Sequence, residues 1–442
     1  MAIIPQRSLF SWREIEELGD LERLGLVLEH LPDEPLMRTL ESERGRGRDD
    51  YPIRAVWNSF LAMVVYQHPS VESLRRELSR NGQLRDLCGF DPVRTAAAVP
   101  PAWVYTRFFR RLGAHADEVQ ALFDRLVEGL KDALPSFGRT LAIDGKAIET
   151  HARPRQKGSR APRPDGRRDV DADFGAKSGF KQQRDGTWIK RVRPWFGYKL
   201  HLVVDADHEL PVAFDVTRAS VAEQPVAHRL VGEMAARHRD LLDGAEHLVA
   251  DKGYDDGKLL SRLFDNHQIK PVIAKRDDWS RDDDETRLLP GTRNVVYDNQ
   301  GNVYCYCPQS GARYTMAYGG FEKDRRTLKY RCPARHYGFP CPGMARCEVK
   351  SAVRIPLSED RRIFTPVARS AYKWQRLYNQ RGAVERVNSR LDVSYGFERH
   401  FIRGLAKMRL RVGLALSVML AMALGRVREN RPEKLRSLVR AA

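Results

Sequence analysis

The sequence has 442 residues, with 76 lysines and arginines against 58 aspartates and glutamates, and a formal net charge of +18. This length allows two or three domains, and the positive charge favours a polyanionic partner, because Lys and Arg neutralise phosphates and release counterions. Five of the six cysteines lie between 305 and 347, which excludes a secreted disulfide scaffold. We expect no signal peptide at the start, and the apolar stretch at 412–424 is too short to span a bilayer, so we expect a buried helix and no membrane partner.

Residues 1–137 carry apolar residues at steps of three and four, separated by proline-rich breaks, and this pattern predicts an all-α N-terminal domain. One of its helices carries three arginines, Arg107, Arg110 and Arg111. Short helices with exposed arginines suit a DNA reader, which must reach phosphates and groove edges. A solvated basic face would give the same pattern, so the alternative stays open.

The sequence pattern changes from helical to strand-like after residue 137. RTLAIDGKAIET predicts a strand that runs into an acid-glycine turn, and FGYKLHLVVDADHELPVAFDVT predicts two strands joined by a turn. Between them, 152–193 carries 13 lysines and arginines against 5 aspartates, which predicts a basic flexible arm that orders on DNA. A helix, a strand, a helix and a strand follow, which indicates an α/β core with a mixed sheet over 138–275 and 364–430. Lys199 lies on one of these strands, either against phosphate or on a solvated edge.

Residues 276–363 interrupt this order with polar sequence and short β-like runs, and we interpret them as a cysteine-containing insertion; 431–442 form a C-terminal tail. Four thiolates can hold zinc tetrahedrally. The candidate ligands are Cys305, Cys307, Cys332 and Cys341, with His336 or Cys347 as alternates. The spacing is irregular for a zinc ribbon, and reduced cysteines without a metal are the alternative.

Two aspartates stand at predicted strand ends, Asp144 in LAIDGK and Asp251 in LVADKGYDD. Carboxylates at the carboxyl ends of strands project into the crevice where an α/β sheet binds ligands, and hard cations such as Mg²⁺ take oxygen ligands. Tyr254 and Asp255 follow closely and are candidates for supporting residues. Each aspartate alone could simply belong to an ordinary turn.

The stretch YNQRGAVERVNSRLDVSYGF at 378–397 predicts one amphipathic helix, whose apolar stripe includes Val384, Val387 and Leu391. A second row holds polar residues at steps of three and four. Its members are Tyr378, Arg381, Glu385, Asn388 and Asp392. A solvated face with charge pairing would look similar.

LAIDGKAIE, FGYKLHLVVD, VADKGYD and YNQRGAVERVNSRL together resemble the catalytic core of DDE transposases of bacterial insertion sequences. The run VESLRRELSRNGQLRDLCGFD, followed by VYTRFFRRL, resembles the N-terminal domain of the same group. The resemblance implies an RNase H-like core in which Asp144, Asp251 and Glu385 hold two Mg²⁺ ions, which Mn²⁺ can replace. It also implies that Tyr378 and Arg381 support Glu385 or meet DNA.

The family helix carries a lysine seven residues after its glutamate, and that position holds Asp392 here. In relatives the lysine contacts DNA near the active site, so this role is open. Candidates for a substitute cation are Arg386, Arg390 and Lys199.

The resemblance implies a DNA transposase, an endonuclease and strand transferase acting on double-stranded DNA at terminal inverted repeats and at a target. Synapsis of two ends implies a homodimer on DNA, and a bacterial host implies a cytoplasmic, nucleoid-associated protein. Two alternatives remain: a catalytically inactive DNA-binding relative that acts as a repressor, and a stand-alone metal-dependent nuclease.

Overall fold

The computed structural model describes residues 19–45, 50–94, 96–154, 169–183, 185–276 and 286–436. The chain divides into two compact units. The first unit comprises Met1–Phe137, Gly145–Val221 and Val384–Ala442, and the second comprises Gly138–Asp144 and Ala222–Ala383. The chain passes between the two units four times, and two of these passages fall inside continuous elements, the strand 140–149 and the helix 382–394, so the units are not simple sequence halves.

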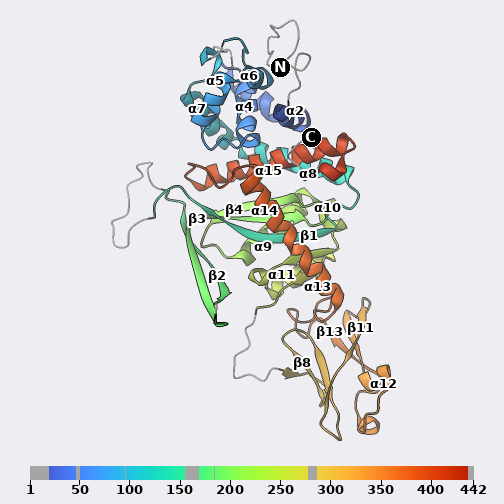
Figure 1. Cartoon of the computed structure of the whole chain (residues 1–442). Helices are drawn as coiled ribbons and strands as arrows, with labels where there is room; N and C mark the ends of the chain where they lie inside the picture. The colour runs from blue at the N-terminus through green and yellow to red at the C-terminus, as the bar shows by residue number, and fades with distance from the viewer. Residues whose placement is uncertain are drawn as a thin grey trace. The chain divides into compact units, whose positions relative to one another are not determined.

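The first unit begins with helices (Figure 1). They are α2 Glu22–His30, α3 Glu34–Arg44, α4 Ile53–Val65, α5 Val71–Arg80, α6 Gly82–Cys88, α7 Ala102–Ala114 and α8 Ala116–Ala133. Polar caps fix where two of them start. The Ser70 side chain accepts the N–H of Ser73 at 3.2 Å, and the Asn81 side chain accepts that of Leu84 at 2.9 Å, which satisfies donors that a first turn leaves open. Helices are therefore confirmed here.

The long apolar helix of the first unit is α15, Leu405–Arg428. It is long and apolar enough to cross a membrane, but 89% of its most apolar window is buried inside the protein. It packs against α8, α2 and the strand β4, Leu210–Arg218, as Figure 1 shows. The expected buried helix is thus confirmed, and its apolar residues serve the core of this unit.

The central sheet has six strands. They are β1 Thr140–Glu149, β2 Asp173–Gln182, β3 Trp188–Asp205, β4, β5 His247–Ala250 and β6 Lys270–Ile273. The strand order is β2-β3-β1-β5-β6, with β4 paired to β3. The pairs β1–β5 and β5–β6 are parallel, whereas β2–β3 and β3–β4 are antiparallel. This mixed sheet, with an all-α N-terminal region, agrees with the predicted RNase H-like α/β fold.

The basic segment 152–193 differs from the prediction. Residues 173–182 and 188–197 pair in an unbroken antiparallel register, from Asp173 opposite Gly197 to Gln182 opposite Trp188. A hairpin of backbone hydrogen bonds therefore replaces the expected irregular arm in this part. Residues 155–168 of the predicted arm lie outside the described residues.

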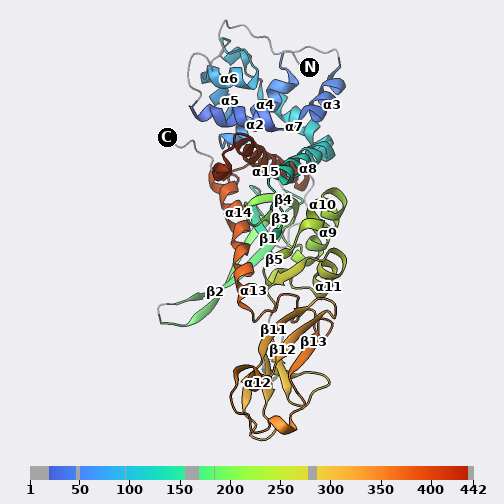
Figure 2. The same cartoon turned by 90° about the vertical axis from the view of Figure 1, so that its right-hand side faces the viewer.

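The second unit holds α9 Glu223–Arg237, α10 Arg239–Gly244 and α11 Gly257–Ser261, with β5 and β6. Its insertion forms two antiparallel sheets, visible in Figure 2. One contains β7 Thr286–Leu288, β8 Val295–Asp298, β9 Val303–Tyr306 and β10 Arg313–Thr315, and the other β11 Ala317–Glu322, β12 Thr327–Arg331 and β13 Ala352–Pro356. Val295, Val303, Leu328 and Ile355 are almost fully buried in a common core, so the insertion has an apolar centre of its own.

The predicted single helix over 378–397 is in fact three pieces. They are α13 Tyr372–Tyr378, the 3-10 turn η6 Asn379–Arg381 and α14 Gly382–Ser394. Gly382 has a φ of −54°, an ordinary helical value, so no left-handed backbone requires glycine there. Val384, Val387 and Leu391 are fully buried, as the apolar stripe predicted.

Candidate active site

The two aspartates at strand ends are brought together by the register of the second unit. Strands β1 and β5 pair in parallel from Thr140 opposite His247 to Ile143 opposite Ala250. Asp144 is the next residue within β1, which continues to Glu149, and Asp251 is the first residue after β5, so the two lie side by side where β5 ends. Both are partly buried. The strand-end prediction therefore holds for Asp251, whereas the turn expected at Asp144 is wrong, because β1 continues through Asp144 to Glu149.

The loop after β5 fixes the Asp251 carboxylate. Its Oδ1 accepts the N–H of Gly253 at 2.8 Å. A Cβ on Gly253 would lie 2.8 Å from that oxygen and 3.6 Å from Cγ of Glu223. Such a contact at 2.8 Å would force the carboxylate to move, so the glycine of the DKGY motif leaves room for the aspartate.

Tyr254 lies under these carboxylates. Its side chain is fully buried, and its hydroxyl has no hydrogen-bond partner among the described residues. Burial raises the pKa of Tyr254 well above its ordinary value, and the nearby charges of Asp144, Asp251 and Glu223 raise it further. The carboxylates of Asp144, Asp251 and Glu223 therefore lie close enough to the buried phenol to raise its pKa.

Glu223 is the member of this group that sequence reasoning missed. It is the first residue of α9, where the positive end of the helix dipole favours a carboxylate. An acidic residue at a helix start is common, so the sequence carried no signal that it lies near Asp251. Only the fold places α9 beside the loop after β5.

Arg381 contacts Asp144 directly. Its Nη1 donates to Oδ2 at 3.3 Å, and the two side chains are 25% and 20% exposed. Arg381 ends η6, which packs on β5, while α13 packs on β5 and β6. Tyr378, at the end of α13, stacks its ring on Trp374 at a centroid distance of 4.8 Å. The predicted Arg381 thus orients a candidate metal ligand.

Glu385 is exposed on α14 and belongs to the first unit. On the same helix, Asp392 forms an ion pair with Lys146, two residues beyond Asp144 on β1. Burial raises the pKa of Asp392, and the hydrogen bond from Lys146 opposes that shift. The sequence left the role of this position open, and in the structure a lysine from the strand pairs with Asp392.

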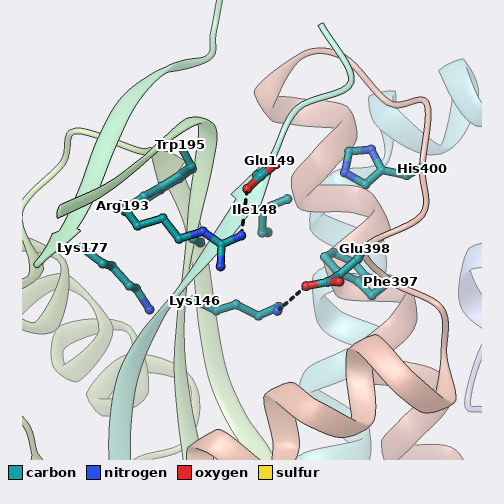
Figure 3. A pocket seen from close by; sticks show the side chains of 10 residues that line it. Lys146, Ile148, Glu149, Lys177, Arg193, Trp195, Phe397, Glu398 and His400 are labelled. Atoms are coloured by element: carbon teal, nitrogen blue, oxygen red, sulfur yellow. Dashed lines mark ion pairs between the residues drawn. The ribbon is translucent and has the colours of Figure 1, made fainter. Parts of the chain in front are cut away.

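Lys146 also lines a hollow of about 430 Å³ in the first unit, drawn in Figure 3. Its Nζ lies 3.9 Å from Oε1 of Glu398. Across the hollow, Arg193 reaches Glu149 at 3.6 Å, but both of those side chains are largely exposed. The ion pairs of Lys146 are therefore better shielded from solvent than the Arg193–Glu149 pair of the same hollow.

Two of the other predicted DNA contacts have structural roles. Lys199 is 7% exposed, and its Nζ donates to the backbone oxygen of Val221 at 2.8 Å. A contact of Lys199 with phosphate is therefore wrong for this arrangement, because its ammonium points inward to a carbonyl. Arg386 is more exposed but donates to the buried Glu209 at 2.7 Å.

The arginines of α7 are split. Arg107 and Arg110 are exposed and line a hollow beside Trp103, which is 61% exposed. Arg111 pairs with Glu43 at 3.4 Å and is half-buried. Two of the three predicted cations are therefore presented to solvent together with an aromatic ring.

The residues at the β1–β5 edge suit a hard cation in their chemistry, since Asp144 and Asp251 offer carboxylate oxygens beside an unpartnered hydroxyl. Among the residues that the structure describes, no group of three or more His, Cys, Asp or Glu side chains has the spacing of a metal site.

A family model described as Transposase DDE domain matches residues 135–421. The chain belongs to this family. The matched range contains Asp144, Asp251 and Glu385, and the match supports a role in DNA transposition. The family generally uses a divalent metal.

A solved structure of a piggyBac transposase synaptic complex with hairpin DNA is similar to this chain at a TM-score of 0.41 and 12% identity. The alignment covers 97% of this chain and 80% of that chain. A similarity at this level carries no argument about function. No curated protein matches the chain.

Proposed function

We propose that this DDE transposase cuts DNA at the ends of a bacterial insertion sequence and joins the cut ends to target DNA in a metal-dependent reaction. The observation that carries the proposal is the register of β1 and β5, which sets Asp144 and Asp251 side by side where β5 ends. Both residues lie in the range matched by the transposase family.

In this proposal Asp144, Asp251 and Glu385 hold two Mg²⁺ ions. The bound ions would supply Lewis-acid stabilisation of the attacking and leaving oxygens in an in-line phosphoryl transfer. The chain itself orients the ligands: Arg381 fixes Asp144, and the N–H of Gly253 fixes Asp251. Water attacks the phosphorus in the cleavage step and the 3′-oxygen leaves as a 3′-OH. The freed 3′-OH then attacks a target phosphate, and the 3′-oxygen of the target strand leaves.

The proposed DNA partner contacts the first unit through Arg107 and Arg110, whose charges are exposed on α7 beside Trp103. The net charge of +18 supports the same partner. We further propose a homodimer on DNA, which brings two ends together, and a nucleoid-associated location in the bacterial cytoplasm.

The test uses the full chain and labelled DNA carrying the terminal repeats that flank its gene. Wild-type protein should nick this DNA in Mg²⁺ and join it to a plasmid, and Asp144→Asn, Asp251→Asn and Glu385→Gln should each lose both activities while still binding DNA. Glu246→Gln is the matched control, since Glu246 pairs with the exposed Arg139 at 2.7 Å in the same unit. Cleavage by Asp144→Asn at the wild-type rate would overturn the assignment.

The same assay separates the alternatives. Binding without cleavage at any metal concentration would favour an inactive DNA-binding repressor. Cleavage without joining would favour a stand-alone nuclease. Either result would contradict the transposase reaction proposed here.

A further inference from the structure

The cysteines of the insertion converge on one place, although they come from separate parts of the chain. Five of them line a single small cavity of about 20 Å³ inside the second unit. They are Cys305 on β9, Cys307 just after it, Cys332 before α12 (Pro333–Tyr337), and Cys341 and Cys347 on either side of a 3-10 turn. All five are free thiols. This arrangement is independent of the carboxylate site and of the reaction proposed above.

Cys307 lies in a setting that favours a thiolate. Its Sγ accepts the N–H of Ser310 at 3.5 Å and that of Gly343 at 3.3 Å. A Cβ on Gly343 would lie 2.8 Å from this sulfur, so the loop approaches Cys307 closely only because residue 343 is glycine. Backbone donors aimed at one sulfur suit a metal-bound thiolate.

Two further cysteines have polar support. Cys341 lies within hydrogen-bonding reach of Cys307, and burial together with that neighbour raises its pKa. Cys347 Sγ accepts a hydrogen bond from Nδ2 of Asn294 at 3.5 Å. Cys332 lies close enough to Cys341 to influence it electrostatically. These three cysteines therefore line the same cavity as Cys307.

Cys305 lies on β9 two residues after Val303, so the two side chains point to the same side of the strand, and both belong to the apolar core of the insertion, as does Cys332. The hydrogen bonds described above go to Cys307 and Cys347. His336, one of the alternates suggested by sequence, is exposed and makes an edge-on ring contact with Tyr337.

We propose that the insertion binds one Zn²⁺ ion through Cys307, Cys332, Cys341 and Cys347, and that Cys305 serves the apolar core instead. This replaces Cys305 in the sequence-based ligand set by Cys347. Zinc accepts four thiolates in tetrahedral geometry. The sulfurs do not yet have the spacing of a metal site in the described residues, so binding draws them inward across the cavity and releases the protons of the remaining thiols.

Such an ion would join three segments that are otherwise held by short strands and a small core. The end of β9, the start of α12 and the loop 341–347 would share one centre. Because a structural zinc contributes directly to folding, its loss should loosen the insertion and leave the helices of the first unit intact.

The experiment uses the full chain purified without chelators, with zinc measured by elemental mass spectrometry and Co²⁺ replacing Zn²⁺ for spectroscopy. We expect one zinc per chain and a thiolate-to-Co²⁺ charge-transfer band. Cys307→Ser, Cys341→Ser and Cys347→Ser should each lose the stoichiometric zinc. Cys305→Ala should keep it. The matched control is Cys88→Ala, since Cys88 is buried in α6 of the first unit.

A second measurement protects the test against misfolded variants. In wild-type protein at one Zn²⁺ per chain, native alkylation followed by mass spectrometry should show Cys307 and Cys347 protected, and a zinc chelator should expose them. Gly343→Ala keeps every cysteine but should weaken zinc binding at least 10-fold in a competition assay, because its Cβ meets Cys307. Protein without stoichiometric zinc, or zinc lost from Cys305→Ala but kept by Cys347→Ser, would overturn the proposal.

Discussion

Lys146 on β1 and Asp392 on α14 form an ion pair in which the side chains are only 12% and 21% exposed. The family helix carries a lysine where this chain has Asp392, so a cation is still present at this point of the first unit, but the strand supplies it. The pair joins residues 246 positions apart in the sequence.

The first prediction concerns the energy of this pair. Lys146→Met or Asp392→Asn leaves the other charge half-buried without its partner, so each change should lower the free energy of unfolding by about 1–3 kcal/mol. The double variant should lose less than the sum of the two. A double-mutant cycle from urea unfolding measures the coupling.

The control is the pair Arg193–Glu149 from the same hollow, whose side chains are 86% and 67% exposed. Solvent screens this pair, so Arg193→Met and Glu149→Gln should couple by less than about 0.5 kcal/mol. Equal couplings in the two cycles would show that burial of Lys146 and Asp392 does not strengthen their pairing.

The second prediction concerns Arg381 and rests on the proposed metal reaction. Its guanidinium contacts Asp144, so it both orients that carboxylate and competes with a cation for it. Arg381→Ala should lower the maximal cleavage rate about 10- to 100-fold. It should also lower the Mg²⁺ concentration needed for half-maximal cleavage, because a positive charge has been removed.

A Mg²⁺ titration of the cleavage rate separates the two effects. Arg376→Ala provides the control, since Arg376 is an exposed arginine on α13. A higher Mg²⁺ requirement in Arg381→Ala would mean that Arg381 does not compete with the cation, and its role would then be orientation alone.

The third prediction concerns the buried phenol of Tyr254. Its hydroxyl is buried and has no partner in the part of the chain that the structure describes, so Tyr254→Phe removes an unsatisfied polar group and keeps the ring. We expect the free energy of unfolding to stay unchanged or to rise by up to about 1 kcal/mol. Tyr254→Ala removes the ring as well and should cost about 3–5 kcal/mol. Marked destabilisation by the Phe variant would indicate that the hydroxyl has a polar partner.

Local patterns predicted much of the site. The local strand patterns singled out Asp144 and Asp251, although Asp144 lies inside β1 and not in the turn that the sequence suggested. The register Ile143–Ala250 then brought them together. The Lys146–Asp392 pair had no local signal, since it depends on which strand meets which helix.

Lys199 shows a different limit of sequence reasoning. Alternation along β3 suggested one solvated face, yet residues 197–206 are buried on both faces, so the alternation could not identify an exposed side.

The basic segment 173–193 shows a third limit of sequence reasoning. Its composition is typical of irregular chain, but backbone pairing of β2 with β3 depends little on side-chain charge.

The fourth prediction concerns Asp255, whose side chain is fully buried. Arg362 donates to it through Nε at 3.1 Å and through Nη2, and the N–H of Arg276 donates at 2.8 Å. Asp255→Asn leaves a guanidinium without its counter-charge and should cost about 3–5 kcal/mol of unfolding free energy. The neighbouring Asp256, which caps α11 through the N–H of Lys258, is the control: Asp256→Asn keeps the cap and should cost less than about 1 kcal/mol. Similar costs would mean that Asp255 does not anchor this loop.

The last prediction concerns pH. Burial lowers the pKa of His247 at the start of β5, and of His400 in the first unit, to about 4. The unfolded chain, with an ordinary histidine pKa near 6.5, binds protons that the folded chain excludes, so stability is full above about pH 6.5 and falls as the pH drops towards 4. Each histidine should account for about 1–3 kcal/mol of this loss. Urea unfolding at pH 7, 6, 5 and 4.5 measures the slope, and His247→Gln or His400→Gln should each flatten it. The exposed His336 is the control, and His336→Gln should leave the slope unchanged. An unaltered slope in both buried-site variants would show that other groups cause the acid sensitivity.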